Sequence, residues 1–416
     1  MAVKKTTISV FLDKTVKKNK FFHPIVNIDL NRMELLKYAI LAWEVPEHVK
    51  ESDYNYLQNK VPALDLYLED FVEFTDDSIF NLGKDDRNKN LISEYLGVGV
   101  GLKYSTLLLN TTPNKFKKIN RPVKGKYLDY STICAKKEYE IETKGTLGNS
   151  YATMKKDVLN KKREQKKNKK IFLRYGTIFL AKKKTVKQGP ASKCVVVDDP
   201  PSTTEIEQDD TFNTQLFSYA IFLSHLLDSK YYNKYIERLR GKRLSKLRIP
   251  QNKFYGIYEF EGKRYFGECF DYRLIVDQFK SDILANKKLK EIFDTLTRRL
   301  GQTKFFIGLE ESVITAINKK DQSFLDGYVV DQRLILEQFV LRFLDRDGIL
   351  LVKSVNGHDK QINKIFPEKE VERRLSLYMN YLNGQAHKCG APCTSPGLEG
   401  KPCEKLTFRE RCYFHR

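Results

Sequence analysis

The sequence has 416 residues, 41% of them hydrophobic, and is therefore long enough to bury cores in more than one globular domain. No apolar run approaches the about 20 residues of a membrane span, and the first residues lack the apolar run of a signal peptide, so we expect a cytoplasmic protein without a membrane partner. The formal net charge of +21 favours a polyanion such as nucleic acid as partner, although a lysine-rich composition alone is an alternative explanation.

Residues 1–86 contain both strand-like and helix-like patterns. Thr6–Leu12 and Pro24–Leu30 have the β-branched and aromatic composition of short strands, whereas Met33–Val45 and Ala63–Phe74 repeat apolar residues at helical spacing. None of these segments carries a motif that indicates a chemistry. We therefore interpret residues 1–86 as an N-terminal α/β extension.

A helix and a hairpin follow the extension. Apolar residues at helical spacing predict a helix over Asn88–Asn110, and three glycines in "GVGVG" would let this helix lie close to a sheet. Lys126–Cys134 and Glu138–Lys144 are then strand-like and are separated by only three residues. The pattern predicts a hairpin that sets Asp129 nearly opposite Thr143.

The second strand of this hairpin alternates charged and mostly apolar residues. Glu138, Glu140, Glu142 and Lys144 occupy every second position and would share one face of the strand. Mg²⁺ is held by one or two carboxylates plus water and substrate oxygens, and Asp129 and Glu142 are placed to supply them. Lys144 could position a nucleophile, stabilise developing charge or transfer a proton. A solvated edge strand is the alternative, and a slip by one residue pair would exchange Glu140 with Glu142.

A strongly basic segment comes next. Between Lys155 and Lys187 there are fourteen Lys or Arg residues and two acidic ones. This density could contact several phosphates, although a lysine-rich helix can also be a solvated face. The candidate nucleic-acid-binding residues are Lys161, Lys162, Arg163, Lys166, Lys167, Lys169 and Lys170. Two strand-like runs, Ile171–Lys184 and Lys193–Pro201, follow the basic helix, and a long helical region begins at Thr211.

Asp129, followed thirteen residues later by Glu142-Thr143-Lys144, resembles the core motif of the PD-(D/E)XK nucleases, the superfamily of many restriction endonucleases. The resemblance covers Asn88 to Pro200. It implies a restriction-endonuclease-like core, a mixed sheet flanked by helices. In that family the two acidic residues bind Mg²⁺ and the lysine assists catalysis, roles that would fall here on Asp129, Glu142 and Lys144.

Two further family features have counterparts in the sequence. A glutamate on the helix before the first strand would correspond to Glu94, and a Gln or Lys on the helix after the second strand would correspond to Gln165 or Lys166. One feature departs from the family, because Leu128 stands where the proline of the motif's name would be. That proline is frequently absent in the family.

The region 248–384 reads as a separate α+β unit. Lys253–Phe270 predicts a hairpin that turns at Glu261–Lys263, and Ser323–Val330 and Gly348–Lys353 are further strand candidates. No catalytic motif occurs in this stretch. We interpret it as an accessory or recognition region.

The last segment, residues 385–416, contains a cluster of cysteine and histidine residues. Zn²⁺ requires four such ligands in a tetrahedron, and so short a segment has too little apolar surface to fold without one. The segment resembles small Cys-and-His knuckles with CGAP, GxxC and CxxH elements, which implies Cys389, Cys403, Cys412 and His415 as structural ligands. Cys393 is an alternative ligand, and His387 is a more remote one.

The sequence thus predicts a nuclease-like domain over 87–247 between the extension and the accessory region. The leading hypothesis is a DNA endonuclease that depends on Mg²⁺ or Mn²⁺ and acts in restriction or anti-phage defence, with RNA as an alternative substrate. A non-catalytic nucleic-acid-binding or regulatory zinc protein is the second hypothesis. A homodimer and a partner protein from the same defence system are both left open.

Overall fold

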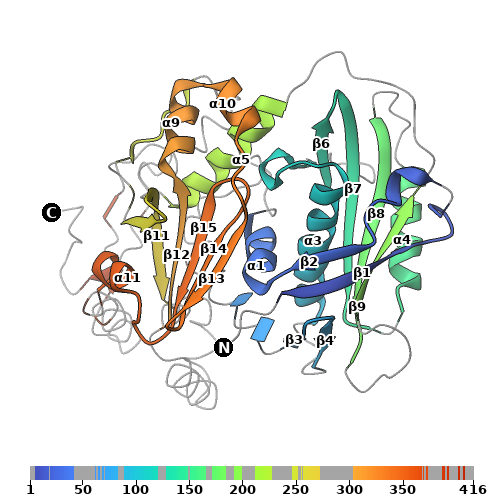
Figure 1. Ribbon diagram of the computed structural model, residues 1–416, viewed down its shortest axis with the longest axis horizontal. Helices are drawn as coiled ribbons and strands as arrows, with labels where there is room; N and C mark the ends of the chain where they lie inside the picture. The colour runs from blue at the N-terminus through green and yellow to red at the C-terminus, as the bar shows by residue number, and fades with distance from the viewer. Residues whose placement is uncertain are drawn as a thin grey trace.

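Two β-sheets lie side by side with helices between and around them (Figure 1). This computed structural model describes residues 5–17, 19–41, 61, 64–65, 68–69, 71–82, 89–119, 128–148, 150–164, 171–183, 192–198, 211–226, 246–251, 254, 256–271, 303–367, 369, 372, 387–388, 391–392, 402 and 406–407. None of the helices in these ranges combines the length and the apolar character needed to cross a membrane.

The first sheet is mixed and has seven strands in the order β2-β1-β9-β8-β7-β6-β5. Two neighbouring pairs, β1 with β9 and β7 with β8, are parallel, and the other pairs are antiparallel. The strands are β1 (Thr6–Leu12), β2 (Asn27–Leu30), β5 (Lys117–Lys118), β6 (Tyr130–Cys134), β7 (Lys137–Thr146), β8 (Ile171–Ala181) and β9 (Ser192–Asp198). The first two strands of the chain therefore extend the sheet of the predicted nuclease-like region.

Helices cover both faces of this sheet. On the face of Thr143 lies α3 (Lys89–Leu108), where a Cβ on Gly97 would meet the backbone of Lys144 at 2.3 Å. This close approach confirms the expectation for the glycine-rich helix. On the opposite face lies α4 (Ala152–Glu164), where a Cβ on Gly176 of β8 would meet the side chain of Val158 at 2.4 Å. Glycine is thus what allows each helix to lie against the sheet.

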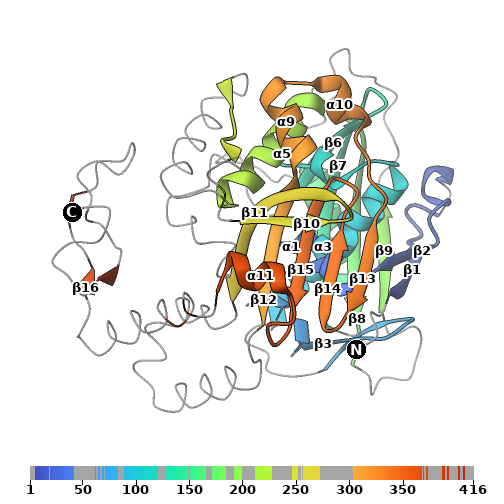
Figure 2. The ribbon, with the colours of Figure 1, turned by 60° about the vertical axis from the view of Figure 1, so that its left-hand side comes forward.

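The second sheet is antiparallel throughout and has six strands in the order β10-β11-β12-β15-β14-β13. Figure 2 shows α9 and α10 near one end of it and α11 near the other. The elements are β10 (Gly256–Phe260), β11 (Lys263–Asp271), β12 (Lys304–Glu310), α9 (Glu311–Lys319), α10 (Gln322–Gly327), β13 (Arg333–Glu337), β14 (Val340–Leu344), β15 (Ile349–Ser354) and α11 (Lys360–Ile365).

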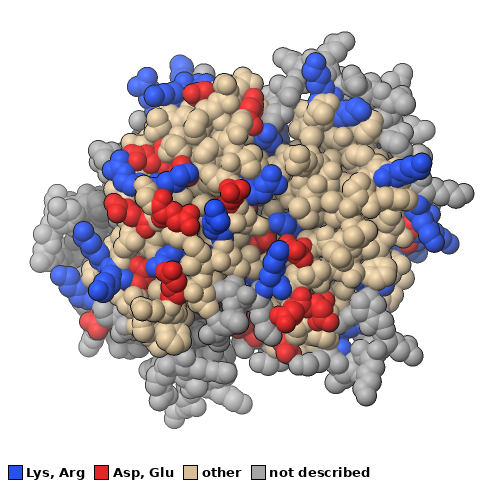
Figure 3. Space-filling view, viewed as in Figure 1, with Lys and Arg blue, Asp and Glu red and all other residues tan. Residues whose placement is uncertain are grey.

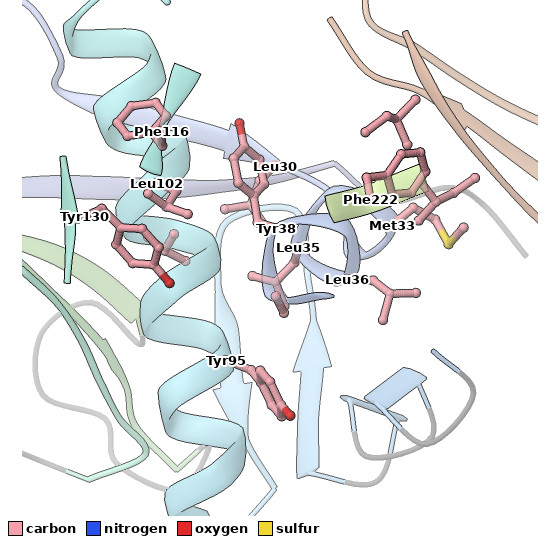
Figure 4. Packing of buried hydrophobic residues seen from close by; sticks show 14 of the residues in the cluster. Leu30, Met33, Leu35, Leu36, Tyr38, Tyr95, Leu102, Phe116, Tyr130 and Phe222 are labelled. Carbon is pink, nitrogen blue, oxygen red and sulfur yellow. The ribbon is translucent and has the colours of Figure 1, made fainter. Parts of the chain in front are cut away.

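Buried apolar residues join the two halves into one core. The helices α1 (Arg32–Leu41) and α5 (Thr211–Leu226) contribute to a hydrophobic cluster that also contains residues of both sheets. In Figure 4 Leu35 of α1 lies toward α3, and Met33 lies beside Phe222 of α5. One hydrophobic cluster of the described residues therefore spans both sheets, and two smaller clusters lie beside it, one in the second sheet and one beneath α4.

Several sequence expectations are confirmed and two are wrong. The strand over Thr6–Leu12, the hairpin that turns at Glu261 and Gly262, and the order α3, β6, β7, α4, β8, β9 all occur as predicted. The strand expected over Ser323–Val330 is instead the short helix α10, whose N-terminus is capped by the Asp321 carboxylate. The helix expected up to Phe74 gives way to β3 (Val72–Phe74), which pairs with β4 (Ile79–Asn81).

Candidate functional site

The site predicted from the hairpin lies at the start of β6 and in the middle of β7. Asp129 immediately precedes β6, and its backbone N–H donates to the Ile141 carbonyl at 3.0 Å. Tyr130 pairs with Ile141, so the next pair in the antiparallel register is Asp129 with Glu142. Asp129 therefore lies one residue away from its predicted position opposite Thr143. The Asp129 carboxylate accepts a hydrogen bond from the backbone N–H of Thr143 at 3.0 Å. Asp129 and Glu142 consequently share one face of the sheet.

Glu142 is the most deeply buried residue of this group. It is 0% exposed, because β7 lies between β6 and β8 and α4 covers this face. The interior position of β7 excludes the alternative of a solvated edge strand. Burial, followed by the nearby Asp129 carboxylate, raises the pKa of Glu142 above its ordinary value. Among the described residues, the Oε2 atom of Glu142 has no hydrogen-bond partner.

Lys144 lies two residues along the same face of β7. Its Nζ is 3.0 Å from Oε1 of Glu142 and 3.3 Å from Oδ2 of Asp157 on α4. Burial lowers the pKa of the Lys144 ammonium, but the adjacent Glu142 carboxylate outweighs this effect, and the resulting pKa is above the ordinary value for lysine. Lys144 is therefore a cation that can donate hydrogen bonds, rather than a neutral amine that could act as a base.

Lys161 enters the site from α4. Its ammonium pairs with Oε1 of Glu142 and lies 3.9 Å from Oδ1 of Asp129. The local reason is the close approach at Gly176, the residue opposite Glu142 on β8, which seats Val158 of α4 on the sheet. Lys161, three residues later on the helix, is thereby brought over the two carboxylates.

Glu140, the alternative to Glu142, has a different environment. Its carboxylate accepts from Nε of Arg174 on β8 at 2.6 Å. Lys162, the neighbour of Lys161, donates to the backbone carbonyl of Arg174 at 2.5 Å and is 5% exposed. Glu142, beside Asp129 and Lys144, is thus the carboxylate that joins the cluster, and Glu140 belongs to an ion pair with β8.

The other predicted site residues have mixed positions. Glu94 is exposed on α3, three residues before Gly97, on the helix that covers the opposite face of the sheet. Lys161 and Lys162 are turned toward the sheet, as described above. The remaining predicted residues, or their side chains, lie outside the described residues: Arg163, Gln165, Lys166, Lys167, Lys169, Lys170, Cys389, Cys393, Cys403, Cys412 and His415.

Part of the basic segment Lys155–Lys187 belongs to the described residues of α4. On α4, Lys156 is exposed, whereas Lys155 pairs with Asp13 at 2.8 Å. Figure 3 shows one face of the molecule, on which basic and acidic side chains are interspersed over the half that contains the six-stranded sheet. Within the described part of that half, this face therefore does not present a surface of one sign.

The described residues offer two carboxylates for a metal ion, not a complete set of ligands. Within the ranges that the structure describes, no group of three or more His, Cys, Asp or Glu side chains is arranged to hold a metal. Mg²⁺ usually keeps several waters and uses one or two carboxylates with substrate oxygens, so Asp129 and Glu142 fit such an ion. The buried Oε2 of Glu142, which lacks a hydrogen-bond partner, is an acceptor that a cation would satisfy.

Comparisons of the chain with protein-family models, with curated proteins and with solved structures found no match. The site is therefore defined by its own geometry, which adds Asp157 to the residues expected from the sequence and places Lys161, expected to contact nucleic acid, beside the carboxylates. One signal for Lys161 was present in the sequence. Tyr151, Met154 and Val158 form an apolar stripe at helical spacing, and Lys161 continues it.

Proposed function

We propose that the protein is a metal-dependent nuclease that hydrolyses phosphodiester bonds of DNA, built on a restriction-endonuclease-like core. The observation that carries this proposal is the pair Asp129 and Glu142 on one face of adjacent chain segments, with Lys144 at 3.0 Å from Glu142. The order α3, β6, β7, α4, β8 agrees with the resemblance to the PD-(D/E)XK nucleases.

Each residue has a role that its environment supports. Asp129 and Glu142 would hold Mg²⁺ or Mn²⁺, which when bound neutralises phosphate charge and makes water a better nucleophile at neutral pH. The hydrogen bond from the Thr143 N–H at 3.0 Å orients the Asp129 carboxylate. Lys144 stays protonated beside Glu142, so it orients the attacking water or stabilises charge on the phosphate rather than accepting a proton.

DNA is the proposed substrate because of the net charge of +21 and the basic segment that contains α4. RNA would use the same chemistry and is distinguished by a substrate panel. The proposed role in restriction or anti-phage defence comes from the family resemblance. The tail would carry a structural zinc knuckle, and the antiparallel pairing of β16 (His387–Lys388) with β17 (Leu406–Thr407) supports that proposal.

The test is cleavage of plasmid, linear and single-stranded DNA and of RNA with Mg²⁺, with Mn²⁺ and with chelator. Replacing Lys144 with alanine should lower the cleavage rate on the order of a hundredfold or more, because a positioned catalytic group is lost. DNA binding measured in chelator should be retained. Lys20→Ala, which removes an exposed lysine outside the basic segment, is the control and should cleave like the parent.

Two outcomes would contradict the proposal. Cleavage by Lys144→Ala at the parent rate would remove Lys144 from the mechanism. DNA binding by the parent without cleavage under any metal condition would favour a non-catalytic nucleic-acid-binding protein. That second function has one observation in its favour, since Lys144 and Lys161 both pair with Glu142 and balance its charge.

A further inference from the structure

We propose that Lys161 is the resident counter-ion of the Asp129 and Glu142 carboxylates, and that a divalent cation binds only by displacing its ammonium. Lys161 would then set the metal concentration at which the site is loaded. The inference rests on the metal site of the proposed function. It differs from the sequence prediction for Lys161, which was contact with nucleic acid.

The geometry places the ammonium where a metal ion would need to bind. Nζ of Lys161 pairs with Oε1 of Glu142 and is 3.9 Å from Oδ1 of Asp129, so it faces both carboxylates. Lys144 also pairs with Oε1 of Glu142, at 3.0 Å. Two ammonium groups thus converge on one oxygen, while Oε2 of the same carboxylate has no hydrogen-bond partner among the described residues.

Charge explains why a divalent ion and the Lys161 ammonium exclude each other. Asp129, Glu142 and Asp157 supply three negative charges, and Lys144 and Lys161 supply two positive charges, so the cluster is close to neutral without a metal. A divalent ion between Asp129 and Glu142 would lie within a few ångströms of Nζ of Lys161, and like charges at that distance repel strongly in a site shielded from water. The ion can bind only after this side chain moves away.

The position of Lys161 on its helix makes it the cation that moves. Lys144 belongs to β7, an interior strand, and its ammonium is shared with Asp157. The Lys161 side chain reaches the site from α4 across the covered face of the sheet, and the two carboxylates it faces are the proposed metal ligands themselves. A long, flexible lysine stem can swing outward without a change in the backbone.

The test is a calorimetric titration with MnCl₂ of the parent and three variants, in the absence of nucleic acid. Lys161→Met keeps an unbranched side chain of nearly the same length and removes its charge, and should bind Mn²⁺ at least about tenfold more tightly than the parent. Lys161→Arg keeps the charge and should not bind more tightly. Lys156→Met removes an exposed charge from the same helix and should bind like the parent.

A second measurement uses the parent alone. Acetylation of lysine side chains, read by mass spectrometry with and without MnCl₂, should rise at Lys161 when the metal is added and stay constant at Lys156. This readout decides the question if Lys161→Met does not fold. Labelling at Lys161 that is unchanged by Mn²⁺ would contradict the displacement.

The outcomes separate the inference from the proposed function. Mn²⁺ binding that is equal or weaker in Lys161→Met than in the parent overturns the displacement by a metal and leaves the nuclease proposal standing. A parent that binds no Mn²⁺ overturns both. Tighter binding by Lys161→Met in a parent that cleaves no DNA or RNA would support the inference and contradict the nuclease.

Discussion

Two clusters of carboxylates and lysines among the described residues differ in how completely their oxygen atoms are paired. One is the candidate site around Glu142. The other, which we call the junction cluster, lies between α1, α3 and the second sheet, and its residues are Glu34, Lys37, Lys103, Gln332, Asp345 and Asp347. The two clusters have similar residue types, and each contains a glutamate that is at most 1% exposed, so composition alone does not distinguish a site from a structural ion-pair network.

The acidic groups of the junction cluster have several partners each. Lys37, which is 1% exposed, pairs with Asp345 and with Asp347, the latter at 2.6 Å. Glu34 accepts from Lys103 at 2.5 Å and from Gln332 at 2.7 Å. Asp345 also accepts from the backbone N–H of Arg346 at 2.7 Å. These bonds join α1 and α3 to the turn between β14 and β15.

The carboxylate oxygens of the candidate site are less completely paired. Oε2 of Glu142 is buried without a hydrogen-bond partner among the described residues, whereas both ammonium groups are directed to Oε1. A buried acceptor without a partner costs free energy, and such groups are often found where a ligand supplies the missing bond. The comparison therefore favours a structural role for the junction cluster and supports the metal-binding role that we propose for the Glu142 cluster.

The largest expected effect comes from breaking the junction cluster. Lys37→Met would leave Asp345 and Asp347 buried without their shared cation, and should lower the free energy of unfolding by about 3–5 kcal/mol. Urea denaturation measures this loss, with the exposed Lys156→Met as control. The cleavage rate of the folded protein should be unchanged. A loss of cleavage without a loss of stability would contradict the assignment of the junction cluster.

A smaller effect concerns the pH dependence of stability. Burial, and then Asp129, raises the pKa of Glu142, so the folded protein holds this proton more tightly than the unfolded chain does. The contribution of Glu142 to stability is therefore full below pH 4.5, the ordinary value, and falls as the pH rises through the raised pKa. In Glu142→Gln the side chain at position 142 cannot ionise, so the variant should not show this loss of stability as the pH rises.

The measurement for this prediction is the difference in unfolding free energy between Glu142→Gln and the parent, followed upward from pH 4.5. The difference should move in favour of the variant and then level off. Glu34 and Asp347 also have pKa values raised by burial, but they are present in both proteins and cancel. A difference that does not change with pH would contradict the environment described for Glu142.

The sequence predicted the local part of the site and not its long-range part. The short turn and the alternation in Glu138–Lys144 were enough to predict the hairpin and the shared face of Glu142 and Lys144. Asp129 was expected opposite Thr143 and instead lies opposite Glu142, a shift of one residue that puts it on the face of Glu142 and Lys144. The turn residues Ala135 and Lys136 adopt positive φ values, which suits a tight connection between twisted strands. Local periodicity therefore predicted the positions of Glu142 and Lys144, and it identified Asp129 with a register error of one residue.

Contacts between distant segments could not be predicted in the same way. Arg174, the partner of Glu140, belongs to a strand that pairs in parallel, and no turn fixes the register of such a pair. The sequence did not show which side of α4 faces the sheet, because lysines occupy both its exposed and its buried sides. The buried pairing of Lys37 with Asp345 and Asp347 joins residues 308 or more positions apart, beyond any local pattern.

The central claim is that the unpaired oxygen of Glu142 belongs to a metal site. A titration of the parent with MnCl₂, repeated on Glu142→Gln and on the matched control Glu140→Gln, tests it most directly. We predict that Mn²⁺ binds to the parent and to Glu140→Gln and that binding is lost in Glu142→Gln. Binding that survives in Glu142→Gln, or its absence in the parent, would contradict the account.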